Sequence, residues 1–181
     1  MGNARAKEWD AKSLRSRTKP TPDTLHRTMR LRFVWTGKTK DARLRALNED
    51  YLKRLARFVR CEVTELRELA GTEGKSGIEK DSRRISDALR SGTVTVVLDR
   101  EGSQWSSEQL AAQVQRWQSD GIKEVNFIVG GPSGVSKALT VAADRRWSLS
   151  QLTFTHEIAR VLLLEQLYRA YAIIHGLPYQ K

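Results

Sequence analysis

A glycine turn that directly follows an apolar run is the part of this sequence best suited to hold a small ligand. Residues 125–129 form the run, and residues 130–134 (Gly-Gly-Pro-Ser-Gly) form the turn. Glycines at a strand end leave room for a ligand because they carry no Cβ atom. In open α/β sheets, ligands bind at the carboxyl ends of strands. A purely structural turn explains the motif equally well, since the phosphate-loop and dinucleotide-binding spacings are both missing.

Few other residues have the types and spacing that catalysis needs. Asp99 and Glu101 follow a second apolar run and are candidates for proton transfer, although exposed loop acids are usually only solvated. The histidines are widely separated, and a single cysteine, Cys61, excludes an internal disulfide and a cysteine-based metal cluster. No serine-nucleophile spacing is present. We therefore expect no metal, and the missing phosphate-binding lysine disfavours a nucleotide hydrolase.

Length and composition indicate one α/β domain. The chain has 181 residues, enough to build a real core. No stretch approaches eighteen uninterrupted apolar residues, so we expect no contact with a membrane. The amino terminus is polar and basic and lacks the apolar segment of a secretory signal. Together with the single cysteine, these features predict a cytoplasmic protein.

The charge of the chain favours a polyanionic partner. It carries 32 Lys and Arg against 21 Asp and Glu, a formal net charge of +11. Such an excess favours binding to nucleic acid, although many proteins are basic without a specific reason. Residues 1–28 lack apolar periodicity, and we expect them to be a disordered or weakly helical basic extension. An RNA-contacting tail and a dispensable extension explain it equally well, and the domain itself is predicted to span residues 29–181.

Alternating strand and helix patterns predict a mainly parallel sheet with helices on both faces. Residues 147–154 read as a strand or an extended loop, and a long apolar helix starts at Thr155 and stops before Gly176. The preceding strands are expected at residues 29–35, 62–66, 93–98 and 125–129, and the preceding helices at 44–58, 78–89, 106–120 and 136–143.

Several ordered motifs give the sequence a specific family resemblance. The motifs are residues 127–136 (Phe-Ile-Val-Gly-Gly-Pro-Ser-Gly-Val-Ser), 147–150 (Trp-Ser-Leu-Ser) with 152–153 (Leu-Thr), 165–170 (Glu-Gln-Leu-Tyr-Arg-Ala) and 178–179 (Pro-Tyr). With these motifs, the sequence from residue 29 to residue 181 resembles the SPOUT-class methyltransferases of large-subunit ribosomal RNA, and among them the branch that methylates N3 of a pseudouridine. Each motif alone is weak, but their order and separations make the resemblance specific.

The resemblance implies an α/β fold with a carboxyl-terminal trefoil knot, a homodimer, and S-adenosylmethionine as cofactor. It also implies 23S ribosomal RNA as substrate, within the assembled ribosome. Three chain segments ending side by side can offer backbone groups and apolar walls to an adenosyl group, which agrees with this implication. The cofactor contacts carried over from the family are Leu98, Gly130, Leu149, Ser150, Gln151, Leu152, Thr153 and Phe154.

The same resemblance implies that His156, Arg169, Tyr179 and Lys181 act on the substrate. For Arg169 the structural alternative is an ion pair within the closing helix. The sequence departs from the family where Gln180 replaces a histidine, and where no prolines flank His156. Because Gln180 cannot act as a base, a non-catalytic RNA-binding or ribosome-assembly factor with the same fold remains the alternative function. The apolar surface of the last helix favours a dimer, since one small sheet cannot cover it all.

Overall fold

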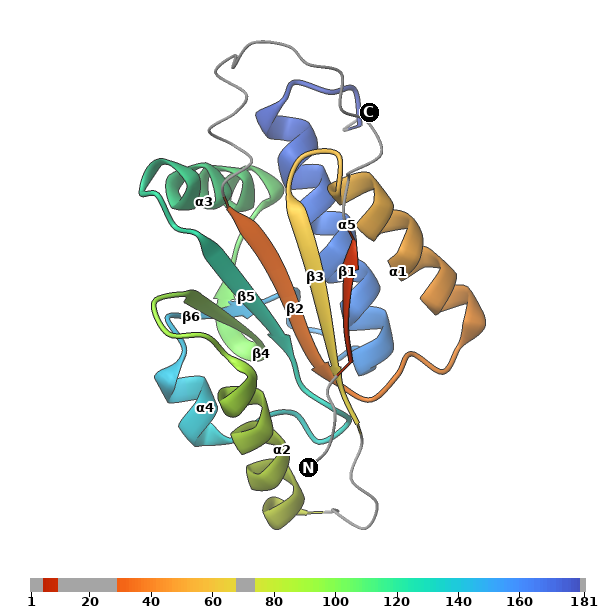
Figure 1. The fold of residues 1–181 in the computed structure, drawn as a ribbon, viewed down its shortest axis with the longest axis vertical. Coiled ribbons are helices and arrows are strands. Elements are labelled where there is room, and N and C mark those ends of the chain that lie inside the picture. Colours follow the sequence, from red (N-terminus) through yellow and green to blue (C-terminus); the bar gives the residue numbers. More distant parts are fainter. Residues whose placement is uncertain (1–4, 10–28, 68–73, 180–181) are drawn as a thin grey trace.

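The computed structural model describes residues 5–9, 29–67 and 74–179 and has an α/β architecture (Figure 1). A six-stranded sheet has the order β1-β3-β2-β5-β4-β6. Strands β2 to β6 run parallel, and only the edge strand β1 is antiparallel to its neighbour β3. The strands are β1 Arg5–Trp9, β2 Arg30–Thr36, β3 Arg60–Leu66, β4 Val94–Gln104, β5 Glu124–Val129 and β6 Arg145–Ser148.

Helices cover both faces of the sheet, as the alternating pattern predicts. Two buried clusters define the faces: the larger one packs under α1, α3 and α5, and the smaller one under α2 and α4. The β-branched and aromatic residues of β2 and β5 are buried on both faces, which is the pattern expected of central parallel strands. The helices are α1 Ala42–Leu55, α2 Lys75–Ala88, α3 Ser107–Ser119, α4 Lys137–Ala142 and α5 His156–Ile174.

Local capping signals set the helix boundaries as expected. Ser106 and Gln109 form a reciprocal capping box at the start of α3. At the other end of the chain, Thr155 caps α5 by accepting a hydrogen bond from the Ile158 N–H, and Gly176 follows the helix with φ 62°. The long closing helix is therefore confirmed within a residue or two of its predicted limits.

Two parts of the fold differ from the sequence-based expectation. The extension predicted to be disordered contains β1, which pairs with β3 from Arg5 opposite Glu65 to Trp9 opposite Cys61. Its five residues lack a sustained apolar pattern in the sequence. The strand is therefore explained by backbone pairing with the edge of β3, and not by hydrophobic periodicity. The rest of the extension lies outside the described residues, and the domain boundary at residue 29 remains a prediction.

The second difference is in β4, which we expected to end at Leu98. The strand continues to Gln104, with an irregularity between Leu98 and Ser103 where it pairs with β6. Gly102 is required there, because a Cβ atom would lie 2.6 Å from the carbonyl carbon of Arg146. The expected loop at residues 99–102 is therefore a bulged part of a strand. Residues 147–154 were expected to form a strand or an extended loop. Residues 147–148 belong to β6, and residues 149–155 form the loop that connects β6 to α5.

The family's trefoil knot stays a prediction.

None of the helices in the described ranges is long and apolar enough to cross a membrane. Within the same ranges, no group of three or more His, Cys, Asp or Glu side chains is placed to bind a metal ion.

Candidate active site

A cleft of about 520 Å³ opens beside the bulge of β4 and the carboxyl ends of β5 and β6. Its walls come from the bulge of β4, from the glycine turn after β5, and from the loop that joins β6 to α5. These segments are distant in sequence but adjacent in space, because parallel strands deliver their carboxyl ends to one edge of the sheet.

The cleft gathers most of the residues assigned to the cofactor from the family resemblance. Gln151 is exposed and is the one assigned residue that does not line it. His156, assigned to the substrate, also lies on the wall. The assigned cofactor residues that line the cleft are Leu98, Gly130, Leu149, Ser150, Leu152, Thr153 and Phe154.

The glycine turn closes tightly on itself and so forms one side of the cleft. The Gly134 N–H donates to the carbonyl oxygen of Gly131 at 2.9 Å, and the two residues form an isolated β-bridge. A Cβ atom on Gly130 would lie 2.7 Å from the carbonyl carbon of Gly134, so no larger residue fits this turn without displacing backbone. The turn therefore presents bare backbone to the cleft.

The loop after β6 is held by hydrogen bonds from its own serines. Ser148 Oγ donates to the carbonyl oxygen of Ser150 at 2.8 Å, and the Leu152 N–H donates to Ser150 Oγ at 3.0 Å. This turn leaves the Leu152 side chain 72% exposed although it borders the cleft. With Leu98 and Leu149 it gives the cleft an apolar surface suited to a flat, apolar group.

Two side chains fix the start of α5 next to the cleft. The Glu157 carboxylate accepts hydrogen bonds from the backbone N–H groups of Lys40 and Asp41, at 2.9 and 3.2 Å. Both hydrogen bonds lower the pKa of Glu157, and the one from Lys40 has the larger effect. Thr155 caps the same helix by accepting a hydrogen bond from the Ile158 N–H, so hydrogen bonds to two segments of the chain hold this loop.

Arg160 connects the same helix to the end of β2. Its side chain is fully buried and donates to Thr39 Oγ1 at 3.0 Å and to the carbonyl oxygen of Thr36 at 2.6 Å. Its guanidinium carbon lies 5.0 Å from the centre of the Trp35 ring. Thr36 in turn borders the glycine turn, 3.8 Å from where a Cβ of Gly131 would lie. Sequence reasoning missed Arg160, because a lone arginine in an apolar helix carries no motif.

A second cluster contains the other substrate-assigned residues that the structure describes, Arg169 and Tyr179. Arg169 forms an ion pair with Glu165 one turn earlier, at 2.6 Å, and its guanidinium lies over the Tyr179 ring at 4.9 Å. The Tyr179 hydroxyl donates to the same carboxylate at 3.2 Å and lies 3.3 Å from the Tyr51 hydroxyl of α1. The structural alternative for Arg169, an ion pair within the helix, is thus present. Lys181 lies outside the described residues.

Burial raises the pKa of Tyr179, and its contacts with Tyr51 and Glu165 raise it further. The phenol therefore stays protonated near neutral pH and acts as a hydrogen-bond donor, not as a base.

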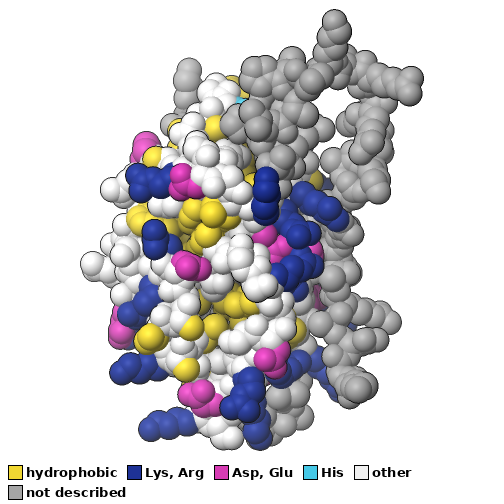
Figure 2. Space-filling model, turned by 60° about the vertical axis from the view of Figure 1, so that its left-hand side comes forward, with side chains coloured by type: hydrophobic (Ala, Val, Ile, Leu, Met, Phe, Trp, Pro, Cys, Tyr) yellow, Lys and Arg dark blue, Asp and Glu magenta, His cyan; other side chains and the backbone are white. Residues whose placement is uncertain are grey.

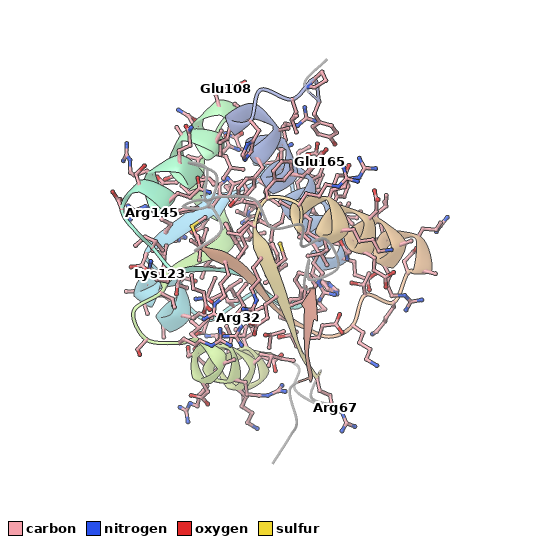
Figure 3. All side chains as sticks on the ribbon, turned by 45° about the horizontal axis from the view of Figure 1, so that its top comes forward. Arg32, Arg67, Glu108, Lys123, Arg145 and Glu165 are labelled. Atoms are coloured by element: carbon pink, nitrogen blue, oxygen red, sulfur yellow. The ribbon has the colours of Figure 1, made fainter. Side chains whose placement is uncertain are left out.

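Within one chain this cluster is remote from the cleft. His156 and Arg169 are thirteen residues apart on α5, which corresponds to about 20 Å along the helix axis. Figure 3 shows Glu165 where α5 approaches α1, well away from Arg145 at the β6 edge of the sheet. A single chain does not bring the two sets of substrate-assigned residues together.

The acids Asp99 and Glu101 are paired with arginine and not free for proton transfer. Arg146 binds the Asp99 carboxylate at 2.9 Å and lies 3.5 Å from that of Glu101. Burial raises the pKa of Asp99, but hydrogen bonds from the Glu101 N–H and Arg146 outweigh this effect and lower it overall. Of these two acids, Asp99 lines the cleft and Glu101 does not.

Comparisons with known proteins bear on the fold and the family of this chain. A crystal structure of a probable methyltransferase from Bordetella pertussis Tohama I superimposes with a TM-score of 0.51 at 14% identity, over 82% of this chain and 98% of that one. Residues 29–180 match the family model described as predicted SPOUT methyltransferase. The chain belongs to the SPOUT methyltransferase family.

Curated relatives of this SPOUT methyltransferase carry the name ribosomal RNA large subunit methyltransferase H. That of Acetivibrio thermocellus is 37% identical over 159 residues, which cover 84% of this chain and 100% of the relative. That of Desulfotalea psychrophila is 40% identical over 157 residues, with the same coverage. The family resemblance inferred from the sequence motifs is therefore confirmed.

The SPOUT methyltransferase cleft also contains residues that sequence reasoning did not assign. Most are neighbours of assigned positions, so their place beside a strand end was the available signal. Ala159 is different, because it comes from the second turn of α5 and carries no local signal. The unassigned wall residues include Val129, Gly131, Pro132, Trp147, Thr155 and Ala159.

Proposed function

We propose that this protein transfers a methyl group from S-adenosylmethionine to N3 of a pseudouridine in 23S ribosomal RNA, in the cytoplasm and within the assembled ribosome. The observation that carries the proposal is that Leu98, Gly130 and residues 149–150 and 152–154 line one cleft. The names of the curated relatives support large-subunit ribosomal RNA as the substrate. The net charge of +11 is consistent with it.

The cleft fits the proposed cofactor. Leu98, Leu149 and Leu152 provide apolar surface for an adenine ring, and the bare backbone at Gly130 allows a close approach. Arg100, exposed at the rim, is the group suited to a carboxylate of the methionine part. When bound, S-adenosylmethionine supplies an electrophilic methyl group on a cationic sulfur.

Residues of the protein orient the acceptor base and accept the proton that it loses. Positioning provides most of the acceleration of such a displacement. N3 of the base must lose a proton, and the His156 imidazole on the cleft wall is the group proposed to accept it. Arg169 would stabilise the negative charge that develops on the base, while Tyr179 donates a hydrogen bond.

A homodimer would bring these groups to one site. Arg169 lies about 20 Å along α5 from His156, and Tyr179 is in contact with Arg169, so the two reach a cleft only if it belongs to a second copy of the chain. In this arrangement each active site combines the cleft of one protomer with the carboxyl-terminal cluster of the other.

The decisive experiment follows tritiated methyl groups from S-adenosylmethionine into ribosomes from a bacterial strain that lacks the corresponding gene. Nucleoside mass spectrometry of the product should show one methylated pseudouridine. The parent chain and an Arg169→Ala variant are compared, with the exposed Arg83→Gln as control.

Isothermal titration with S-adenosylmethionine separates the enzyme from a non-catalytic RNA-binding factor. Binding together with methyl incorporation supports the enzyme. RNA binding without cofactor heat or methyl incorporation would establish the non-catalytic factor, for which Gln180 is the motivating residue.

A further inference from the structure

A second hollow lies along the free edge of the sheet, outside the cleft. Its volume is about 560 Å³, and we call it the β6 groove. Strand β6 is the last strand of the sheet, and the groove is bordered by α3 on one face and by α4 on the other. Its lining includes Trp105, Arg116, Val141, Asp144, Arg145 and Arg146.

The arginines of the groove differ in their pairing. Arg146 is occupied by Asp99 and Glu101. Arg145 donates to the backbone oxygen of Asp144 at 2.7 Å, and no carboxylate in the described ranges pairs with either Arg145 or Arg116. Both side chains are exposed. Two guanidinium groups that line one groove, from α3 and from β6, therefore keep most of their donors for a bound anion.

The acidic residue that lines the groove, Asp144, is hydrogen-bonded to the sheet. The Asp144 carboxylate accepts the Thr95 N–H of β4 at 2.8 Å, so it is already used in holding the edge of the sheet. Figure 2, in which the side of the molecule that lies on the left in Figure 1 comes forward, shows Lys and Arg side chains, with Asp and Glu side chains among them, spread around hydrophobic side chains. Val141, which lines the groove, is 74% exposed.

The groove adjoins the cleft. Arg146 lines the groove while its ion-pair partner Asp99 lines the cleft, and the next residue, Trp147, is on the cleft wall. Trp105 of the groove stacks on Trp147 with ring centres 5.3 Å apart. A polyanion lying in the groove would therefore pass directly beside the proposed methylation site.

We propose that the β6 groove binds the phosphodiester backbone of the substrate RNA next to the nucleotide that enters the cleft, with Arg116 and Arg145 contacting phosphates. The identity of the polyanion as RNA rests on the proposed function. The nearness of the cleft favours RNA over an acidic protein, because a substrate strand must occupy both hollows at once. Phosphate contacts of this kind fix the register of a nucleic acid and make its binding dependent on salt.

The test measures binding of a fluorescein-labelled fragment of large-subunit ribosomal RNA by fluorescence anisotropy at several salt concentrations. The double variant Arg116→Gln/Arg145→Gln is compared with the parent chain and with Arg83→Gln. Arg83 is an exposed arginine of α2 without an ion pair in the described ranges, and it is the matched control. Titration with S-adenosylmethionine and thermal melting establish that every variant is folded.

The double variant should bind the RNA at least tenfold more weakly, and the slope of log affinity against log salt should decrease by about 1.4–1.8, as expected for two lost phosphate contacts. Cofactor affinity should stay within twofold of the parent value. Unchanged RNA affinity and slope, or an equal loss in Arg83→Gln, would overturn the proposal. So would competition by polyaspartate as effective as that by unlabelled RNA.

Failure of the proposed function is recognised separately. If neither the parent chain nor any variant transfers methyl groups, but the double variant still loses RNA binding selectively, the groove proposal stands and the enzyme proposal falls. If methyl transfer is normal in the parent chain and in the double variant at subsaturating RNA, the groove proposal alone falls.

Discussion

The Arg160 side chain donates a hydrogen bond to the carbonyl oxygen of Thr36 at 2.6 Å, across 124 positions of sequence. This contact joins the start of the closing helix to the carboxyl end of a central strand. The Thr36 Cβ lies beside the glycine turn of the cleft. The geometry of the cleft therefore depends on a buried cation that does not line it.

Replacing Arg160 with Met should lower the free energy of unfolding by about 2–4 kcal/mol. The substitution leaves the buried Thr36 carbonyl and Thr39 hydroxyl without this donor. Arg169→Met on the same helix is the matched control, since its i,i+4 pair is only partly buried and should cost about 1 kcal/mol. Urea denaturation measures both, and an equal loss in the two variants would contradict the role of Arg160.

The link between Glu157 and residues 40–41 should depend on pH. The pKa of the Glu157 carboxyl is lowered in the folded chain. The hydrogen bonds to residues 40 and 41 therefore stabilise the fold fully above the pKa of the unfolded chain, about 4.3, and this stabilisation is lost as the pH falls through the lower pKa of the folded chain. The parent chain should therefore be more stable than Glu157→Gln at pH 7, by on the order of 1 kcal/mol.

The difference between the parent chain and Glu157→Gln should shrink below about pH 4. Thermal melting from pH 7 to pH 3 measures it, with Glu49→Gln on the exposed face of α1 as control. A difference that grows as the pH falls would have the wrong sign for this link.

Leu152→Ala should weaken S-adenosylmethionine binding about five- to tenfold without lowering the melting temperature, because a side chain that is 72% exposed contributes little to the core. Leu47→Ala is the control, since Leu47 is also exposed, at 43%, but lies on α1 away from the cleft. Titration calorimetry compares the two. Equal effects on cofactor affinity would place the adenosyl group elsewhere.

Mixing two inactive variants tests the shared active site. Leu152→Asp should block cofactor binding and Arg169→Ala should remove the substrate-side cation, so each homodimer should be inactive. If the sites are shared, subunit exchange should restore roughly a quarter of the parental methyl transfer, because half of the dimers are mixed and each of these has one intact site. No recovery in mixtures that contain mixed dimers, as verified by mass spectrometry, would show that the sites are not shared.

Much of the fold could be predicted from the sequence because the signals are local. The β-branched runs of β4 and β5, the capping box at Ser106 and the stop at Gly176 depend only on neighbouring residues. The expectation failed for β1, whose residues have no apolar pattern in the sequence and which pairs with the edge of β3. It also failed at the β4 bulge, where the close approach of Gly102 to β6 keeps the chain in the sheet.

The sequence by itself determined the alternating α/β order, the glycine turn and the family motifs, since spacing and residue type carry them. Only the tertiary structure decided that Leu98, Gly130 and Leu152 share a cleft, that Arg160 and Glu157 hold its border, and that Arg169 lies too far along α5 to reach it within one chain. The physical reason is that side chains distant in sequence meet only after packing places their elements, and no local pattern records those distances.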